Sequence, residues 1–476
     1  MNWARQLYSL ATWAAQPLLR RKLRRRAVKE PGYAEAVPER FGVYSPASLG
    51  HDGRGQWVWI HAVSLGETRV AAILLKELRA QIPKMRLLLT HGTATGRAEG
   101  QKLLREGDVQ VWQPWDSQQA TARFVRQFQP AIGILMETEI WPNLIVACQQ
   151  QGVPVTLANA RLSDKSLQGA LRIAPLSKPA YGALSAAWAQ TDADAQRLRA
   201  LGAPVKAVVG NIKFDIEPEA EQLAQGQRWR AAARGAGTGA GADADSRPIV
   251  MLASSREGEE AQWLEIFKAK IFEPNQPPEP NTPVQAATES IVNAQVQAQV
   301  KNPVKARLQW LIVPRHPQRF DEVAALLEQA GIKVSRRSSW RDGPEADADS
   351  DTVWLGDSLG ELAVYYAMAD VALLGASFEP LGGQNLIEAA ACGCPVIMGP
   401  HTFNFAQAAD MACEAGAALR ATGMPEAVEK AGQLVSDAAA LAATRQRALD
   451  FSRQHKGAAA ATARAVRQLL ASRGRG

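Results

Sequence analysis

The sequence predicts an α/β protein built from two Rossmann-like domains. Short apolar segments alternate with amphipathic helical segments in both halves of the 476-residue chain, a pattern typical of parallel sheets covered by helices. A glycine-containing loop also follows one apolar segment in each half. The expected strands are 57–60, 86–90, 132–136, 155–157, 187–189 and 207–209 in the first half, and 249–255, 308–313 and 371–374 in the second.

The stretch 382–405 predicts a glycine loop, a short helix, a tight turn, a buried strand and a second loop. Gly382 and Gly383 let the backbone approach a ligand closely, and a helix that begins near Asn385 directs free amide groups at a phosphate. Glu388, about one turn into that helix, can accept hydrogen bonds from the two hydroxyls of a ribose. These features predict a sugar-nucleotide pocket. The alternative is an ordinary turn with a solvated Glu388.

A second loop, HAVSLGET at 61–68, lies between the expected strand at 57–60 and an amphipathic helix at 69–80. It places Glu67 at the N-terminus of that helix, beside a glycine. Loops of this kind lie at the carboxyl ends of the strands in α/β sheets. We therefore expect the two loops to face each other across a cleft between the domains.

Eight segments match a known family in order over nearly the whole chain. They are ERFGVY from 39, HAVSLGE from 61, METEIWPNLI from 136, ANARLS from 158, GNIKFD from 210, VPRHPQRF from 313, GDSLGEL from 356 and GPHTFNF from 399. The chain resembles the 3-deoxy-D-manno-octulosonic acid (Kdo) transferases of lipopolysaccharide assembly. That family moves Kdo from CMP-Kdo onto lipid A precursors. One loop departs from it: the family usually has GGHNPLE where this chain has GGQNLIE, with Gln384 and Leu386 in place of His and Pro.

The resemblance implies the glycosyltransferase arrangement called GT-B, in which the first domain binds the acceptor and the second holds CMP-Kdo. It implies that Glu67 is the general base, taking the proton from a glucosamine hydroxyl as it attacks the anomeric carbon of Kdo. Glu137 and Lys213 are implied to stabilise the transition state, the carboxylate at the sugar and the ammonium at the leaving phosphate. For Glu67 the alternative is a glutamate stabilised by the helix dipole. For Glu137 it is a helix cap, and for Lys213 it is a surface salt bridge.

The same resemblance assigns the CMP-Kdo contacts to three segments of the second half. No metal is implied, because amides and a basic side chain can neutralise a single phosphate, and no cofactor is expected. The implied contact residues are Pro314, Arg315, Leu359, Gly360, Glu361, Asn385, Leu386, Ile387 and Glu388.

The net charge of +7 is concentrated at the N-terminus. Residues 1–30 hold eight Lys or Arg and one Glu, which leaves 46 basic and 46 acidic residues in the remainder. A nucleic-acid-binding domain normally carries a basic stripe on its folded body, so this distribution argues for a different anionic partner. The length and the 46% apolar content allow two substantial cores.

The N-terminal arm combines an apolar stretch at 7–19 with the basic run RRKLRRR at 20–26. The apolar stretch is short for a membrane span of about 20 residues, and Gln16 and Pro17 interrupt it, so we expect a helix that lies on the membrane surface. Its basic run follows the apolar stretch, which disfavours a secretory signal and favours contact with anionic cytoplasmic lipids. The expected location is the cytoplasmic face of the inner membrane of a Gram-negative bacterium. The alternative is a solvated basic helix that caps the first domain.

Composition also suggests where the domains meet. The small and polar stretch 230–247 is typical of a linker, and 273–305, rich in Pro, Gln and Asn, is typical of a surface insertion. We predict a membrane-surface anchor at 1–30, an acceptor domain at 31–229, a linker at 230–247 and a CMP-sugar domain at 248–476. The helix after 457 is expected to pack back across the hinge.

We predict no metal site from the cysteines or from the acidic triplets. The four cysteines lack zinc-like spacing and fit free thiols in a reducing compartment. Two of the three DAD triplets lie in expected loops, while Asp192 and Asp194 suit the start of a helix.

Two functions from other classes stay open. A nucleotide-sugar epimerase of the same fold would lack the membrane arm and a base placed like Glu67. A non-catalytic, membrane-associated nucleotide-sugar-binding protein, suggested by the altered GGQNLIE loop, would bind CMP without a Glu67-dependent reaction.

Overall fold

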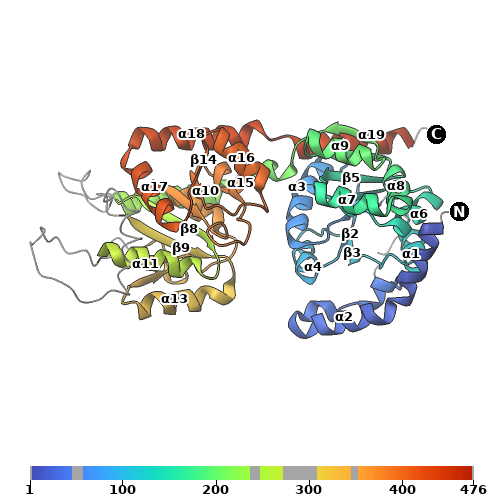
Figure 1. Cartoon of the computed structure of the whole chain (residues 1–476), viewed down its shortest axis with the longest axis horizontal. Helices are drawn as coiled ribbons and strands as arrows, with labels where there is room; N and C mark the ends of the chain where they lie inside the picture. Colours follow the sequence, from blue (N-terminus) through green and yellow to red (C-terminus); the bar gives the residue numbers. More distant parts are fainter. Residues whose placement is uncertain (1–2, 46–56, 236–246, 272–307, 345–351, 474–476) are drawn as a thin grey trace, which may run out of the picture. The chain divides into compact units, whose positions relative to one another are not determined.

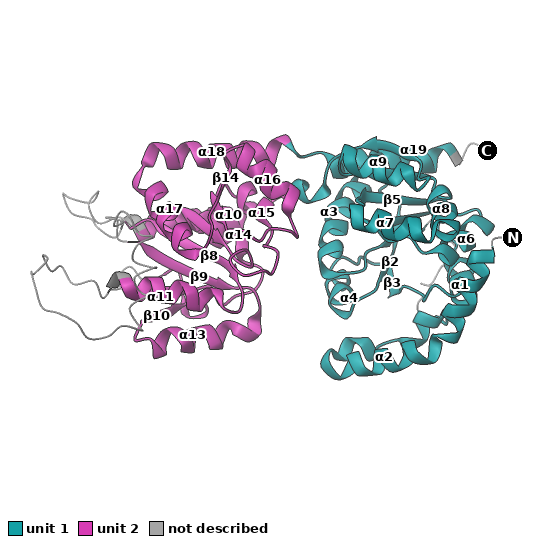
Figure 2. Cartoon of the chain, viewed as in Figure 1, with its two compact units in different colours: residues 1–215, 455–476 teal, residues 216–454 magenta. Residues whose placement is uncertain are grey.

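The computed structural model describes residues 3–45, 57–235, 247–271, 308–344 and 352–473 (Figure 1). The chain forms two compact units: unit 1 comprises residues 1–215 and 455–476, and unit 2 comprises residues 216–454 (Figure 2). Each unit contains its own parallel sheet with covering helices, so the predicted pair of α/β domains is confirmed.

Unit 1 holds a seven-stranded parallel sheet in the order β3-β2-β1-β4-β5-β6-β7. The winding direction reverses between β1 and β4, and ligands of open α/β sheets bind at such a switch point, outside the carboxyl ends of the strands. The strands are β1 Trp57–His61, β2 Arg86–His91, β3 Val109–Trp112, β4 Ile132–Met136, β5 Val155–Ala160, β6 Ala186–Ala189 and β7 Val205–Val208.

Apolar side chains pack against both faces of this sheet. Successive residues of a strand point to opposite faces, so Trp59 belongs to one core and Ile60 to the other. Helices α5, α6, α8 and α9 cover the Trp59 face, and α3 and α19 cover the Ile60 face. The helices are α3 Leu65–Gln81, α4 Ala94–Gln101, α5 Gln118–Phe128, α6 Pro142–Gln150, α7 Asp164–Arg172, α8 Ala174–Gly182, α9 Asp192–Ala200 and α19 Ala458–Arg473.

Unit 2 repeats this architecture with the strand order β10-β11-β9-β8-β12-β13-β14, again all parallel. Its switch point lies between β8 and β12. The strands are β8 Ile249–Ser255, β9 Gln309–Pro314, β10 Val334–Arg336, β11 Val353–Leu355, β12 Val371–Leu374, β13 Val396–Met398 and β14 Ala418–Arg420. The helices are α10 Ala220–Gly235, α11 Glu259–Ile271, α13 Phe320–Gln329, α14 Leu362–Met368, α15 Leu386–Ala391, α16 Ala406–Glu414, α17 Met424–Ser436 and α18 Ala438–Gln454.

The division into units differs from the predicted boundaries. The predicted linker 230–247 begins inside α10, and the chain passes from unit 1 to unit 2 at 215/216 instead. Helix α10 belongs to unit 2 because it crosses α14 closely: a Cβ on Gly226 would lie 2.2 Å from the carbonyl oxygen of Val364. Residues 236–246 and the predicted insertion 273–305 lie outside the described residues.

The C-terminal segment also corrects the predicted domain at 248–476. The chain returns from unit 2 to unit 1 at 454/455, so α19 belongs to unit 1 and packs against α3. The carboxylate of Asp215 holds the start of α19 by accepting hydrogen bonds from the amides of Gly457 and Ala459, the latter at 2.7 Å.

Two helices form the N-terminal arm. Helix α1 (Trp3–Ala14) and helix α2 (Gln16–Lys29) meet at the expected interruption, with Pro17 in the first turn of α2. Leu23 of α2 packs with Tyr33 and Phe41, which lie in the 3₁₀ segments η1 (Pro31–Ala34) and η2 (Val37–Phe41). Among the described residues, no helix combines the length and the apolar character that crossing a membrane requires.

Candidate active site

The loop between β1 and α3 fixes the carboxyl group of Glu67. Ser64 is the N-cap of α3: its Oγ accepts a hydrogen bond from the Glu67 amide at 3.3 Å and donates one to Oε1 of Glu67 at 3.0 Å. The Val63 amide donates to Oε2 of Glu67 at 2.9 Å. This reciprocal arrangement resembles a capping box, so Glu67 lies at the helix N-terminus that the sequence predicted.

The surroundings of Glu67 favour proton uptake. Burial raises the pKa of its carboxyl group, because the ionised form loses water. The hydrogen bond from Val63 opposes that shift in pKa, and the charge of Glu137 adds to it. A carboxylate whose pKa is raised is a stronger proton acceptor than an ordinary surface glutamate.

Glu137 lies at the carboxyl end of β4, beside the switch point of unit 1. Its side chain is buried and pairs with two cations: Oε2 lies 2.8 Å from Nε of Arg161, and Oε1 lies 3.4 Å from Nζ of Lys213. Its backbone has φ of 56°, a left-handed conformation that is uncommon outside glycine and that clusters at functional sites. The geometry therefore differs from the helix-cap alternative, because Glu137 contacts other side chains of the candidate site.

Lys213 is positioned by its 3₁₀ segment, η4 (Ile212–Asp215). The Ile212 amide donates to Oδ1 of the buried Asn159 at 2.9 Å, which ties η4 to the carboxyl end of β5. Asp215, at the other end of η4, holds the start of α19. Lys213 is thus held from both sides at the same edge of the sheet as Glu137.

Glu139 is a third acidic residue of this cluster, and the sequence analysis did not single it out. Its Oε2 accepts a hydrogen bond from Nε1 of Trp141 at 3.0 Å. Burial raises the pKa of Glu139 to about 7, and the charge of Glu67 adds to the shift. Unit 1 therefore gathers Glu67, Glu137 and Glu139 with two cations at one edge of its sheet, an arrangement suited to moving a proton beside a developing positive charge.

His61, which the sequence placed in the same loop, has a structural position. The ring is fully buried, and its Nδ1 lies 2.9 Å from Oγ1 of Thr90 in the neighbouring strand. Burial lowers the pKa of His61 to about 3, so the ring stays neutral at physiological pH. His61 thus fixes the loop that carries Glu67.

The residues implied to contact CMP-Kdo lie at or after the carboxyl ends of strands of unit 2. Pro314 ends β9, and the Arg315 amide donates to the carbonyl oxygen of Ser255 at the end of β8, at 3.0 Å. Leu359 and Gly360 follow β11, and Leu359 is 70% exposed. The carboxylate of Glu361 pairs with Arg337 at 2.8 Å.

The segment from Gly382 to Glu388, which includes the start of α15, comes after β12. Gly382 has φ of 93°, and a Cβ there would lie 2.4 Å from the side chain of Asn404, so the close packing of the two loops requires glycine. Asn385 is the N-cap of α15, where its Oδ1 accepts from the Ile387 amide at 3.2 Å, so that amide is already engaged. Leu386 and Ile387 are buried, whereas Glu388 is partly exposed.

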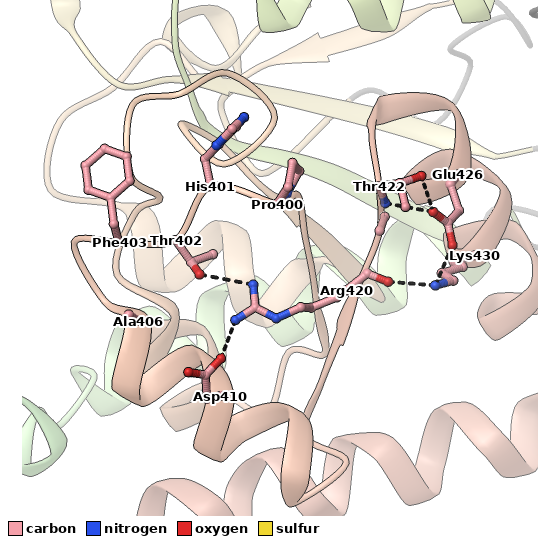
Figure 3. Close-up of a pocket in the computed structure, with 11 residues that line it drawn as sticks. Pro400, His401, Thr402, Phe403, Ala406, Asp410, Arg420, Thr422, Glu426 and Lys430 are labelled. Carbon is pink, nitrogen blue, oxygen red and sulfur yellow. Dashed lines mark hydrogen bonds and ion pairs between the residues drawn. The ribbon is translucent and has the colours of Figure 1, made fainter.

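A cavity of about 710 Å³ lies beside the second loop of this region, 399–405 (Figure 3). Arg420 crosses it, donating to Oγ1 of Thr402 at 3.0 Å and to Asp410 at 2.6 Å. Lys430 donates to the carbonyl oxygen of Arg420 at 2.6 Å and pairs with Glu426 at 2.7 Å. The cavity is lined by the residues after β13 and β14, and none of the implied CMP-Kdo contacts is among them.

Comparison with known proteins decides the family. Residues 35–216 match the family described as 3-deoxy-D-manno-octulosonic-acid transferase (kdotransferase). The chain is 41% identical to the 3-deoxy-D-manno-octulosonic acid transferase of Bordetella pertussis, over 98% of this chain and 99% of that one. The chain belongs to the Kdo transferase family. The transferase of the same name from Haemophilus influenzae is 30% identical over 90% of this chain and 89% of its own.

Membership of the Kdo transferase family supports a glycosyltransferase function. Both domains are parallel-sheet α/β domains. Among solved structures, Anabaena HepE in complex with UDP is similar in fold, with a TM-score of 0.50 and 12% identity over 88% of this chain and 100% of that one.

The partners of the candidate residues were not predicted from the sequence. Arg161 lies within the quoted segment ANARLS, and Glu139 within METEIWPNLI, but neither was assigned a role. Arg161 comes next to Glu137 because β5 pairs with β4, and Glu139 comes near Glu67 because β4 pairs with β1. Arg161 follows β5 and Glu139 follows β4, so a position just after the carboxyl end of a strand near the switch point is the signal that identifies such partners.

Proposed function

We propose that the protein transfers Kdo from CMP-Kdo to a hydroxyl of a lipid A precursor such as lipid IVA, without a metal, with Glu67 as the general base. The observation that carries this proposal is the position of Glu67: its carboxyl group is fixed by Ser64 and Val63, and its pKa is raised by burial. The overall similarity to Kdo transferases supports the sugar that is transferred.

In the proposed reaction, the acceptor oxygen forms a bond to the anomeric carbon of Kdo while its proton moves to Glu67. The bond between that carbon and the phosphate oxygen breaks, and CMP leaves with the electron pair. Positive charge develops on the sugar, and the carboxylate of Glu137 stabilises it. Lys213 and Arg161 hold that carboxylate in place, and the ammonium of Lys213 also offers a partner to the leaving phosphate.

The donor half of the proposal involves the carboxyl edge of unit 2. Its loops come from neighbouring strands, since β9, β8 and β12 adjoin one another in the sheet. In this proposal Glu388, in α15 after β12, accepts hydrogen bonds from the ribose hydroxyls, and Arg315, which follows β9, is a partner for the phosphate.

The N-terminal arm is proposed to lie on the cytoplasmic face of the inner membrane. Helix α1 exposes Trp3, Leu7, Leu10 and Trp13, at 64%, 58%, 60% and 59%. In α2, the exposed cations Arg21, Lys22, Arg24 and Arg25 follow directly. An apolar helix followed by a basic one suits a surface of anionic lipids, where the acceptor would also reside.

A direct assay tests this function. Purified full-length protein is incubated with CMP-Kdo and lipid IVA in detergent with a chelator, and the lipid product is identified by mass spectrometry. The expected result is a lipid heavier by one or more Kdo units together with release of CMP. Omission of lipid IVA is the control for simple hydrolysis of CMP-Kdo. CMP release without a Kdo-bearing lipid would contradict the proposed acceptor, and binding of CMP without turnover would favour the non-catalytic alternative.

A further inference from the structure

A buried carboxylate connects the N-terminal arm of unit 1 to helix α6. Asp116, which follows β3, is 4% exposed and accepts hydrogen bonds from the amides of Asn143 at 3.1 Å and Leu144 at 2.8 Å. The Asn143 side chain donates back to the carbonyl oxygen of Asp116 at 2.8 Å. The N-cap residue of α6, Trp141, makes no side-chain capping bond, so Asp116 supplies the cap from another part of the chain.

Helix α1 is attached to this cap by polar contacts. The hydroxyl of Tyr8 forms a hydrogen bond with the Asp116 carboxyl group, and Oγ of Ser9 donates to Oδ1 of Asn143 at 2.9 Å. Helix α1 packs against α6 and α8 (Figure 1). None of its residues is fully buried. The apolar residues Trp3, Leu7 and Leu10 stay exposed, so the burial of apolar surface contributes little to holding α1 on unit 1.

The capped end of α6 is also one end of the loop that carries two of the acidic residues of the candidate site. Residues 137–141 join the end of β4 to the start of α6. Within this loop Glu137 has a left-handed backbone conformation, and Trp141 donates a hydrogen bond to Glu139. The backbone of the loop is therefore fixed at one side by the sheet and at the other by the start of α6, where Asp116 accepts the first amides.

We propose that Tyr8 and Asp116 are positioning residues that couple the seating of α1 on an anionic lipid surface to the conformation of the loop 137–141. The expected effect of this coupling on transfer rests on the proposed function, whereas its expected effect on the conformation of the loop does not. Burial of Trp3, Leu7 and Leu10 in lipid would stabilise α1 in one orientation, which keeps Tyr8 and Ser9 on the cap of α6. A ligand that prefers one conformation shifts the equilibrium toward it, and here the lipid surface is that ligand.

Hydrogen–deuterium exchange of the full chain tests the coupling without requiring turnover. Exchange in peptides covering 137–150 is measured with and without vesicles of phosphatidylcholine and phosphatidylglycerol, for the natural protein, Tyr8→Phe and Thr12→Val. Tyr8→Phe removes only the hydroxyl group that reaches Asp116. Thr12→Val is the matched control, because the Thr12 hydroxyl donates within α1, to the Ser9 carbonyl oxygen at 3.0 Å.

All three proteins should bind the vesicles equally. On binding, exchange at 137–150 should become slower in the natural protein and in Thr12→Val. In Tyr8→Phe it should not become slower. In the transfer assay with vesicles, Tyr8→Phe should lower kcat about five-fold and leave KM for CMP-Kdo unchanged, as the loss of one hydrogen bond predicts. Vesicle binding without any change at 137–150 in the natural protein, or equal protection in Tyr8→Phe, would overturn the coupling. Absence of product from all three proteins would count against the proposed function alone, since the exchange result stands independently.

Discussion

Nζ of Lys213 lies 3.4 Å from Oε1 of Glu137, so these two side chains form an ion pair. In the proposed transition state they stabilise charges of opposite sign. The pair joins the carboxyl end of β4 to η4, and Arg161 occupies the second oxygen of the same carboxylate. Because the groups share one carboxylate, removal of either partner should disturb the other. Their effects on catalysis should therefore not be additive.

Lys213→Met should lower kcat by roughly 10²-fold, since one charged stabilising group is lost. Glu137→Gln should do the same, and the double variant should lose much less than the product of the two effects. Single-turnover transfer of Kdo measures the three rates. Lys206→Met, on an exposed residue of β7, is the control and should keep the natural rate. Fully multiplicative losses in the double variant would contradict a functional pair.

Glu139 should make unit 1 less stable as the pH rises. Burial raises its folded-state pKa from 4.5 to about 7, so the unfolded chain releases the proton first. The stability that the protonated carboxyl group contributes is present below pH 4.5 and is lost as the pH rises through 7. Glu139→Gln should remove this loss. Between pH 4.5 and pH 8, the free energy of unfolding of unit 1 should therefore fall by about 1–3 kcal/mol less in Glu139→Gln than in the natural protein.

Exchange of the β1 and β4 amides in urea reports the stability of unit 1 separately, because a chain of two units need not unfold in one step. Glu106→Gln, which replaces an exposed glutamate, should keep the pH dependence of the natural protein. If the stability of unit 1 depended on pH in Glu139→Gln as it does in the natural protein, Glu139 would not titrate in this range.

Leu7→Glu combined with Leu10→Glu should weaken binding to anionic vesicles, because both side chains lie on the exposed apolar surface of α1. The affinity of the natural protein should also fall as salt is added, since each Lys or Arg near an anionic surface contributes about 1 kcal/mol. Vesicle cosedimentation measures both effects. Val43→Glu, another exposed apolar residue outside the two helices, is the matched control. Equal binding by the double variant and the control would remove α1 from the membrane contact.

Glu388→Gln should weaken CMP binding by roughly 10²-fold, as expected when a charged acceptor of the ribose hydroxyls is lost. Gln384→His, which restores the usual family residue, should change CMP-Kdo turnover by no more than a few fold, because one hydrogen-bonding side chain replaces another. Isothermal titration with CMP measures the first effect and steady-state kinetics the second. A large rise in turnover for Gln384→His would show instead that Gln384 changes the choice of donor.

The central strands were predictable because they are buried on both faces and therefore apolar throughout. Strands β1 and β12 are such cases, and both were predicted close to their observed bounds. Strands β3, β10, β11 and β14 were missed, because each has only three or four residues. Strands β3, β10 and β14 are also edge strands that include partly exposed residues. The crossing of the chain at 215/216 was also missed, since it depends on the contact of Gly226 with α14.

Glu67 was predictable because its neighbours in the sequence, Ser64 and Val63, provide its contacts. Asp116 and Glu139 were not, because the contacts that identify them involve other elements of the fold, although Glu139 also accepts a hydrogen bond from the nearby Trp141. Asp116 gains its meaning from α1 and α6, and Glu139 from its proximity to Glu67 across two strands that are neighbours only in the sheet. Local sequence carries little information about such contacts.

The most direct measurement is the transfer of Kdo from CMP-Kdo to lipid IVA by the natural protein and by Glu67→Gln, with vesicle binding and CMP affinity measured on both. Gln keeps the size of the side chain and removes its ability to accept the proton. The account predicts that transfer falls by roughly 10²-fold or more, while CMP affinity and vesicle binding stay the same. Transfer at the natural rate in Glu67→Gln would contradict the assignment of Glu67 as the general base.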